Sequence, residues 1–294
     1  GRPYLGPAPE LSGLFIAAGM NSNGILMSGG TGLTMAEWMT EGLPRKGMTS
    51  LLAARAMPFQ ANRRYLAERV TEALGLHYGL QWPGRQIETA RGIRRVPLHA
   101  ELRAAGALFS ERAGWEVPQY YDAAAAGRWP TRPSLGWQDW SPAVEAECLA
   151  ARDAIVLLDQ SMYGKLIVQG PDAVKALDRV AAASIDIAVG ASVYTPFVNV
   201  RGGIEADNTV TRLGPQKFLV VTGHPSQIRD RDFIATHADP TWRFEIFDAT
   251  SSFALLSLHG PASRALLQEL SSDNLSNAAF PFGAARVIDL AFAR

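Results

Sequence analysis

One pattern occurs twice in the second half of the chain, in residues 166–177 and 256–267. Each copy has a short apolar run, a Gly-Pro pair and then a segment with helical spacing. Such a run predicts a strand, Gly-Pro predicts a turn, and the proline suits the first turn of a following helix. The repeat therefore predicts two related β-turn-α units within one domain.

Three β-rich runs lie between the two copies, at residues 193–200, 204–213 and 218–222. Arg-Gly-Gly and Gly-Pro-Gln-Lys separate them, and connections this short are typical of antiparallel hairpins. We therefore expect an antiparallel meander and an α+β fold. A helix over residues 142–153, with Ser141 as its N-cap, is expected before the first copy.

The first half of the chain begins differently. Residues 13–19 form an apolar run bounded by glycines, which predicts a buried strand. Residues 20–32 are rich in Gly, Ser and Asn and are expected to form a loop. Residues 33–42 then have helical spacing, with Gly42 as the C-terminal stop. Two further helices are expected, at residues 62–76 and 97–105.

Charge and composition exclude several classes of protein. The 28 basic and 28 acidic residues give a net charge of zero, whereas a nucleic-acid binder carries a basic excess. The one cysteine, Cys148, cannot form an internal disulfide. His77 and His99 have no partner at ligand spacing, so no metal site is expected. No apolar stretch is long enough to cross a bilayer, and the Ala- and Arg-rich composition favours a bacterial cytoplasmic protein.

The chain opens without Met and stops within an apparent strand, at residues 287–294. Domains normally end at exposed, polar sites, so we expect an internal fragment of a larger protein. Residues 127–136 are the best candidate for an internal linker, because they are rich in Pro and Gly.

Residues 20–32 have two interpretations. Their small side chains would let a flat ligand or a phosphate approach the backbone, and the N-terminus of the following helix would favour negative charge, such as that of a reduced flavin. Alternatively, they form a tight strand-to-helix turn in which glycine serves packing alone. The spacing is not G-x-G-x-x-G, so spacing alone favours the second interpretation.

Residues 3–9, 13–25 and 28–32 resemble the C-terminal end of the FAD domain in dimethylglycine and sarcosine dehydrogenases, which are D-amino-acid-oxidase-like flavoproteins. The resemblance implies that the six residues matching the flavin-contact stretch lie against the isoalloxazine ring: Met20, Asn21, Ser22, Asn23, Gly24 and Ile25. Residues 80–99 and 106–118, with their Gly-Trp-Glu-x-Pro pattern, resemble the connector that follows that domain.

Residues 158–173, 193–199 and 202–207 resemble the aminomethyltransferase, or T-protein, of the glycine cleavage system. The resemblance implies three parts: residues 1–56 as the end of an FAD-dependent oxidoreductase domain, 57–138 as a connector with linker, and 139–294 as an incomplete folate-binding aminomethyltransferase domain. It also implies a folate site formed by Tyr194, Ala206, Asp207 and Asn208.

Asp207 would be the catalytic carboxylate, hydrogen-bonded to the folate amine and assisting proton transfer. The family usually has an acidic residue at the position of Ala206 and an aliphatic one at Asn208. Strand alternation places Asp207 and Thr209 on one face, which without the resemblance would be an ordinary solvated face. For Tyr194, stacking on the pterin and a cross-strand contact are both open.

The succession of parts implies FAD-dependent oxidative N-demethylation of a methylated glycine-type amine, dimethylglycine or sarcosine, with the carbon passed to tetrahydrofolate. An electron-transfer flavoprotein would be a further partner, and the location would be the mitochondrial matrix in a eukaryote. Two alternatives remain: a stand-alone folate-dependent aminomethyltransferase, and a non-enzymatic regulator like the regulatory subunit of pyruvate dehydrogenase phosphatase. The chain alone is expected to bind FAD poorly and to lack dehydrogenase activity.

Overall fold

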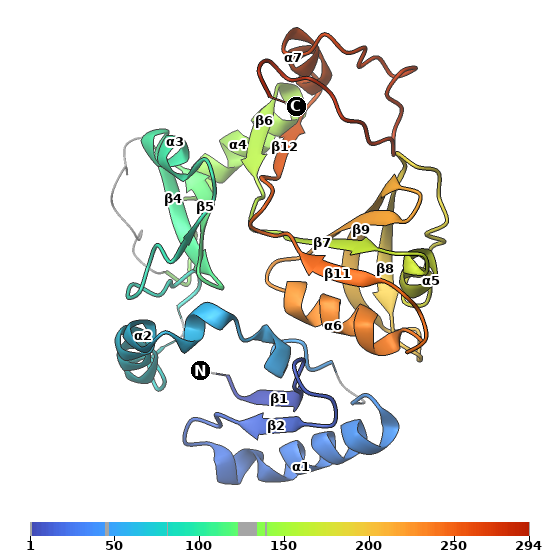
Figure 1. Ribbon diagram of the computed structural model, residues 1–294. Helices are drawn as coiled ribbons and strands as arrows, with labels where there is room; N and C mark the ends of the chain where they lie inside the picture. Colours follow the sequence, from blue (N-terminus) through green and yellow to red (C-terminus); the bar gives the residue numbers. More distant parts are fainter. Residues whose placement is uncertain (1, 45–46, 81, 123–133, 139, 294) are drawn as a thin grey trace. The chain divides into compact units, whose positions relative to one another are not determined.

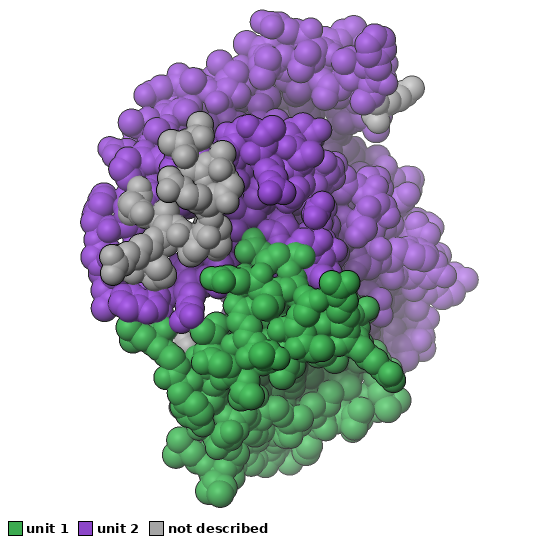
Figure 2. Space-filling view, turned by 90° about the vertical axis from the view of Figure 1, so that its left-hand side faces the viewer, with its two compact units in different colours: residues 1–81, 87–91 green, residues 82–86, 92–294 purple. Residues whose placement is uncertain are grey.

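The computed structural model describes residues 2–44, 47–80, 82–122, 134–138 and 140–293 (Figure 1). The chain divides into two compact units (Figure 2). Unit 1 comprises residues 1–81 and 87–91, and unit 2 comprises residues 82–86 and 92–294. Helices and strands occur together in both units, which confirms the predicted α+β class.

Unit 1 is built on one antiparallel strand pair and one long helix. Strand β1 (Tyr4–Pro7) pairs with β2 (Phe15–Ala18), and α1 (Gly24–Glu41) follows. Its core is small, because Leu5 packs with Met35 and Trp38 of α1 and a few half-buried neighbours. Two short 3-10 helices, η1 (Ala53–Arg55) and η2 (Pro58–Ala61), lead to α2 (Arg63–Gly75).

Helix α1 begins at Gly24 and not at Leu33, so the predicted loop over residues 20–32 is wrong from Gly24 onward. Gly29, Gly30 and Gly32 lie inside the helix, each with open space where a Cβ would be. An internal glycine costs about 1 kcal/mol relative to alanine, but strong helix formers on both sides outweigh that cost. Gly42 ends the helix in the left-handed conformation, as predicted.

Unit 2 contains a five-stranded antiparallel sheet in the order β11-β7-β10-β9-β8. Three of its strands are consecutive in the chain and form the predicted meander. The strands are β7 (Gly164–Gln169), β8 (Ser192–Val198), β9 (Ile204–Gly214), β10 (Lys217–Thr222) and β11 (Glu245–Asp248).

Two helices cover one face of this sheet, α5 (Ala173–Asp178) and α6 (Gln227–His237) (Figure 1). Leu166, Phe218 and Ile234 are fully buried between these layers. The alternate residues of the strands, among them Tyr194 and Asp207, therefore point to the other face. This second face of the sheet carries the candidate site.

Both copies of the repeat fold as strand, turn and helix, although their prolines precede the helix N-cap. The second copy forms β12 (Leu256–His259) and α7 (Ser263–Glu269), and β12 pairs with β6 (Val156–Asp159) in a separate sheet. Gly170 and Gly260 have φ angles of +137° and +117°. A Cβ on Gly170 would lie 2.6 Å from the Arg243 carbonyl oxygen, so the turn requires glycine.

A three-stranded sheet precedes these elements, in the order β3-β5-β4. Its strands are β3 (Arg94–Arg95), β4 (Ala107–Arg112) and β5 (Trp115–Tyr121), with α3 (His99–Ala104) between the first two. The β4–β5 hairpin was not predicted from the sequence. Helix α4 (Ser141–Asp153) follows, and its N-cap is Trp140, so the predicted cap at Ser141 is wrong by one residue. The predicted linker, residues 127–136, lies mostly outside the described residues.

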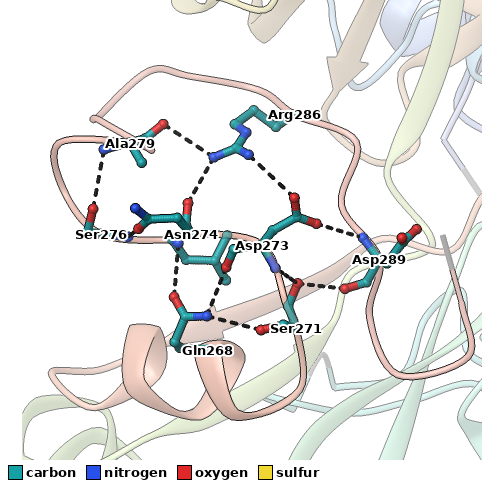
Figure 3. Close-up of polar contacts among 9 residues, drawn as sticks. Gln268, Ser271, Asp273, Asn274, Ser276, Ala279, Arg286 and Asp289 are labelled. Atoms are coloured by element: carbon teal, nitrogen blue, oxygen red, sulfur yellow. Dashed lines mark hydrogen bonds and ion pairs between the residues drawn. The ribbon is translucent and has the colours of Figure 1, made fainter.

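The segment after α7 is held by polar contacts (Figure 3). Gln268 donates to the carbonyl oxygens of Ser271 and Asp273, and the Arg286 guanidinium donates to that of Asn274. Arg286 also pairs with the Asp273 carboxylate at 3.6 Å. Side-chain and backbone hydrogen bonds therefore fix the path of this segment, which adds little to the apolar core.

Candidate functional site

A cavity of about 700 Å³ lies in unit 2, against the face of the five-stranded sheet that α5 and α6 do not cover. It is bounded by the sheet, by the β4–β5 hairpin and by the turn between β6 and β7. The lining residues with functional groups are Arg112, Gln119, Gln160, Tyr163, Tyr194, Asp207, Asn208, Thr209, Thr222 and His224.

Strand register brings Tyr194 and Asp207 together. In the β8–β9 ladder Tyr194 lies opposite Thr209 and Pro196 lies opposite Asp207, so Tyr194 and Asp207 are diagonal neighbours on one face. The hydrogen bond between the Tyr194 hydroxyl and the Asp207 carboxylate raises the pKa of Tyr194. Tyr194 is 70% exposed, so its ring is open to the cavity and not packed in a core.

The residues beside Asp207 point the other way. Ala206 and Asn208 belong to the buried face of β9, with exposed fractions of 4% and 1%. Ala206 packs in the apolar core and is not among the cavity-lining residues. Asn208 does line the cavity, and neither atom of its side-chain amide has a hydrogen-bond partner within the described part of the chain. Of the residues predicted for the folate site, Tyr194 and Asp207 are thus the two whose side chains share its open face.

A buried lysine shapes the turn between β6 and β7. The Lys165 ammonium donates to the carbonyl oxygens of Ser161 and Tyr163, at 2.8 and 3.0 Å. Burial lowers the pKa of Lys165, while the carboxylates of Asp159 and Asp248 raise it in part. Asp159 also accepts from the Ser161 backbone N–H. These contacts fix a turn that presents Gln160, Met162 and Tyr163 to the cavity.

The β4–β5 hairpin supplies a further boundary of the cavity. Trp115 and Val117 of β5 pack with Val96 and with Met162 from the turn, which joins the hairpin to the wall of the cavity. On the cavity side, the Arg112 guanidinium donates to the Gln119 side-chain oxygen at 3.5 Å. Sequence reasoning missed Arg112, Gln119 and His224; the Gly-Trp-Glu-x-Pro pattern beside Arg112 was the available signal for the hairpin.

A second cavity in unit 2, of about 790 Å³, lies beside the Gly170 turn and the β9–β10 connection. Its lining includes Lys217, Arg243 and Glu245 but no residue predicted for a site. It is the larger of the two, yet its charged residues are exposed and no buried polar group faces it. We therefore take the cavity of Tyr194 and Asp207 as the candidate site.

The predicted flavin-contact segment lies in unit 1, at the turn between β2 and α1. Asn21 and Ser22 have positive φ angles of 47° and 68°, and the position of a Cβ on Gly24 meets only Met20. The first turn of α1 holds no acidic residue, and its N-cap, Asn23, makes no side-chain capping bond. The segment is not sealed under side chains, so its backbone N–H groups and the helix dipole fit an electron-rich flat ring.

No cluster of three or more His, Cys, Asp or Glu side chains in the described part of the chain could hold a metal ion. Within the same residues, no helix combines the length and the apolar character needed to span a bilayer.

Comparisons with known proteins agree with this arrangement. Residues 98–294 match the family described as GCVT N-terminal domain, and residues 41–95 match the FAD dependent oxidoreductase central domain. The first match covers the whole cavity lining.

Three curated relatives align with nearly all of the chain. A 4-methylaminobutanoate oxidase (formaldehyde-forming) of Paenarthrobacter nicotinovorans is 40% identical over 98% of the chain. The mitochondrial sarcosine dehydrogenase of Mus musculus is 33% identical over 98%. The mitochondrial pyruvate dehydrogenase phosphatase regulatory subunit of Mus musculus is 30% identical over 94%. The chain spans 35%, 35% and 32% of the lengths of these relatives.

Proposed function

Because the chain belongs to the GCVT N-terminal domain family, we propose that its cavity binds tetrahydrofolate and that the protein containing it demethylates an N-methylated amine with FAD. The observation that carries the proposal is the meeting of Tyr194 and Asp207 on one wall of a cavity of about 700 Å³. A cavity of this size lies in the range of small-molecule sites.

Asp207 is the proposed catalytic residue. Its carboxylate accepts a hydrogen bond from an amine N–H of the bound folate and assists proton transfer while the one-carbon unit attaches. The Tyr194 hydroxyl donates to that carboxylate and orients it. The exposed ring of Tyr194 is free to stack on the pterin or aminobenzoate ring. Ala206 and Asn208 would contribute through their backbone, since their side chains belong to the buried face.

Residues 20–25 form one wall of the proposed flavin site. When bound, FAD supplies the hydride acceptor for oxidation of the N-methyl carbon. The residues of this chain that hold it are the exposed turn of Asn21 and Ser22 and the uncapped start of α1 at Gly24. The proposed substrate is a methylated glycine-type amine, dimethylglycine or sarcosine. Two relatives are named for oxidation of N-methyl amino acids, which supports that class.

The finer assignments are proposals of the same kind. An electron-transfer flavoprotein would reoxidise the flavin. The location would be the bacterial cytoplasm, or the mitochondrial matrix in a eukaryote, as the name of the sarcosine dehydrogenase relative suggests.

The test is titration of the full-length protein with FAD and with tetrahydrofolate, under anaerobic conditions, beside the Asp207→Ala variant. The proposal expects a stoichiometric flavin that sarcosine or dimethylglycine reduces at the same rate in both proteins. It also expects capture of the carbon by tetrahydrofolate in the wild type, and release of formaldehyde instead in the variant. An unchanged variant would remove Asp207 from the site.

A protein that binds neither compound would contradict the enzymatic proposal. That result would favour the non-enzymatic regulator, the second candidate, for which the similarity to the pyruvate dehydrogenase phosphatase regulatory subunit is the specific observation. Folate binding without flavin binding would favour a stand-alone aminomethyltransferase.

A further inference from the structure

Gly223 is a cavity-lining glycine that the fold itself does not require. It follows β10 and lines the cavity of Tyr194 and Asp207. Its φ angle is not in the left-handed region, and apart from its chain neighbours no atom of the described residues lies within 4 Å of the position of a Cβ. By contrast, a Cβ on Gly164 would lie 2.5 Å from the Thr222 side chain. Neither backbone strain nor packing therefore explains the glycine at position 223.

Strand register shows which residues of the sheet point to the same face. Gly164 of β7 pairs with Thr222 of β10, which pairs in turn with Asn208 of β9. This row faces the helices, because its side chains are buried and the Thr222 hydroxyl donates to the Asp230 carboxylate of α6. Successive residues of a strand point to opposite faces, so the next row points into the cavity.

That next row consists of Tyr163, Gly223 and Asp207. Each of them is the chain neighbour of one residue of the buried row, and all three line the cavity. Strand β10 lies between β7 and β9, so Gly223 lies between the other two. Two strand spacings separate the Cα atoms of Tyr163 and Asp207 by roughly 10 Å. The row forms a slot, with Gly223 as its floor and Tyr163 and Asp207 as its sides.

Both sides of the slot are held in place by other residues. The Lys165 ammonium donates to the carbonyl oxygen of Tyr163 at 3.0 Å, which fixes the backbone of that residue. On the other side, the Tyr194 hydroxyl is hydrogen-bonded to the Asp207 carboxylate. A ligand that enters the slot therefore has few side chains to immobilise, which lowers the entropic cost of binding.

The slot fits a flat ring with N–H groups on its edge. Because Gly223 has no side chain, such a ring can approach the backbone to the contact distance of carbon atoms, about 3.5–4 Å. The floor continues through Val221 and Thr209, a cross-strand pair of small side chains that also line the cavity. Tyr163 offers an aromatic contact to the ring, and Asp207 accepts from its N–H groups. The pterin of tetrahydrofolate is a ring of this kind.

We propose that Gly223 and Tyr163 determine the ligand specificity of the cavity, and that the pterin ring lies over Gly223 between Tyr163 and Asp207. The inference rests on the proposed folate function and adds the position of the ring. Tyr163 packs against the ring, and the bare backbone at Gly223 lets the ring reach the floor of the slot. Asp207 then lies at the edge of the ring, where its carboxylate accepts from a ring N–H.

Anaerobic calorimetry of the full-length protein, titrated with tetrahydrofolate, tests this placement. Gly223→Val should weaken binding by about tenfold or more, because its side chain fills the layer that the ring occupies. Gly223→Ala adds less bulk and should weaken binding less. Tyr163→Ala should weaken it by about fivefold through loss of the aromatic contact. Tyr163→Phe keeps the ring and should retain most of the affinity.

A matched control and an unfolding measurement complete the test. Gly214→Val places the same side chain at a glycine of the second cavity, where a Cβ meets only the Lys217 side chain, at 3.8 Å. It should bind tetrahydrofolate as the wild type does, and both valine variants should keep the thermal unfolding midpoint of the wild type. Unchanged affinity in Gly223→Val, equal weakening in Gly214→Val, or a destabilised Gly223→Val overturns the slot but leaves the folate function standing. A wild type that does not bind tetrahydrofolate overturns both.

Discussion

The two candidate sites of this chain differ in how enclosed they are. The cavity of unit 2 has walls from three parts of the chain and rests on a sheet whose core includes Leu166, Phe218 and Val220, all fully buried. The turn at Gly24 in unit 1 is a single exposed wall, followed by a helix on which Ile25 and Leu26 are 96% and 86% exposed. One region is a concave cavity, and the other is an exposed surface of the described chain.

The difference in burial determines how each unit can be studied. Burial of apolar side chains drives folding, so unit 2 holds most of the stabilising core of the described chain, and its cavity should keep its shape without a ligand. Helix α1 is apolar over much of its surface but buries mainly Met35 and Trp38. We therefore test the folate proposal on the chain itself and the flavin proposal on the full-length protein.

The largest expected effect comes from the core of unit 2. Phe218→Ala should lower the free energy of unfolding by about 3–5 kcal/mol, because a large side chain leaves a cavity. Leu26→Ala on α1 should change it by no more than about 0.5 kcal/mol, since that side chain is exposed. Urea unfolding of the chain measures both. An equal loss of unfolding free energy in the two variants would mean that α1 is packed in solution. The two units would then not differ in how well their side chains are buried.

A second expected effect is the pH dependence of unit 2. His224 has a pKa of about 4 in the folded chain and about 6.5 when unfolded, so the unfolded state binds the extra proton between these values. Stability should therefore fall as pH drops from about 6.5 to 4, by up to about 3 kcal/mol. His224→Phe should flatten this part of the profile in urea unfolding at several pH values. If stability changed with pH in the same way in the wild type and in His224→Phe, the His224 ring would be solvated in the folded chain.

A third comparison uses two glycines. Gly170→Ala in unit 2 forces a side chain into a left-handed turn against the Arg243 carbonyl and should destabilise by about 2 kcal/mol. Gly30→Ala lies inside α1 with open space around it and should stabilise by up to about 1 kcal/mol. Thermal unfolding of the two variants shows whether each substitution stabilises or destabilises the chain. A destabilising Gly30→Ala would mean that something covers this face of α1.

The smallest expected effect concerns the flavin wall. Gly24→Val should leave folding nearly unchanged, because a Cβ there meets only Met20 at ordinary contact distance. In the full-length protein, the added bulk should weaken FAD binding by about 1 kcal/mol, or roughly fivefold. Flavin fluorescence during titration of the apoprotein measures this. A variant that binds FAD as the wild type does would separate this turn from the isoalloxazine ring.

Sequence reasoning succeeded where the signal was local. The alternation around Val210 predicted the meander, and the Gly-Pro pairs predicted both strand-turn-helix units. It failed at α1, where three glycines suggested a loop although their apolar neighbours support a helix. It also missed Arg112 and His224, because neither belongs to a motif. Their place on the cavity depends on how the hairpin packs beside the sheet, which no local pattern encodes.

Hydrogen–deuterium exchange of the chain, with and without tetrahydrofolate, tests most directly where the ligand binds. Slower exchange is expected in four segments that line the cavity: residues 112–119, 160–163, 207–209 and 221–224. Residues 214–217 and 243–245, at the larger second cavity, should not change. Protection confined to that second cavity, or no protection anywhere at saturating tetrahydrofolate, would contradict the assignment of the folate site to Tyr194 and Asp207.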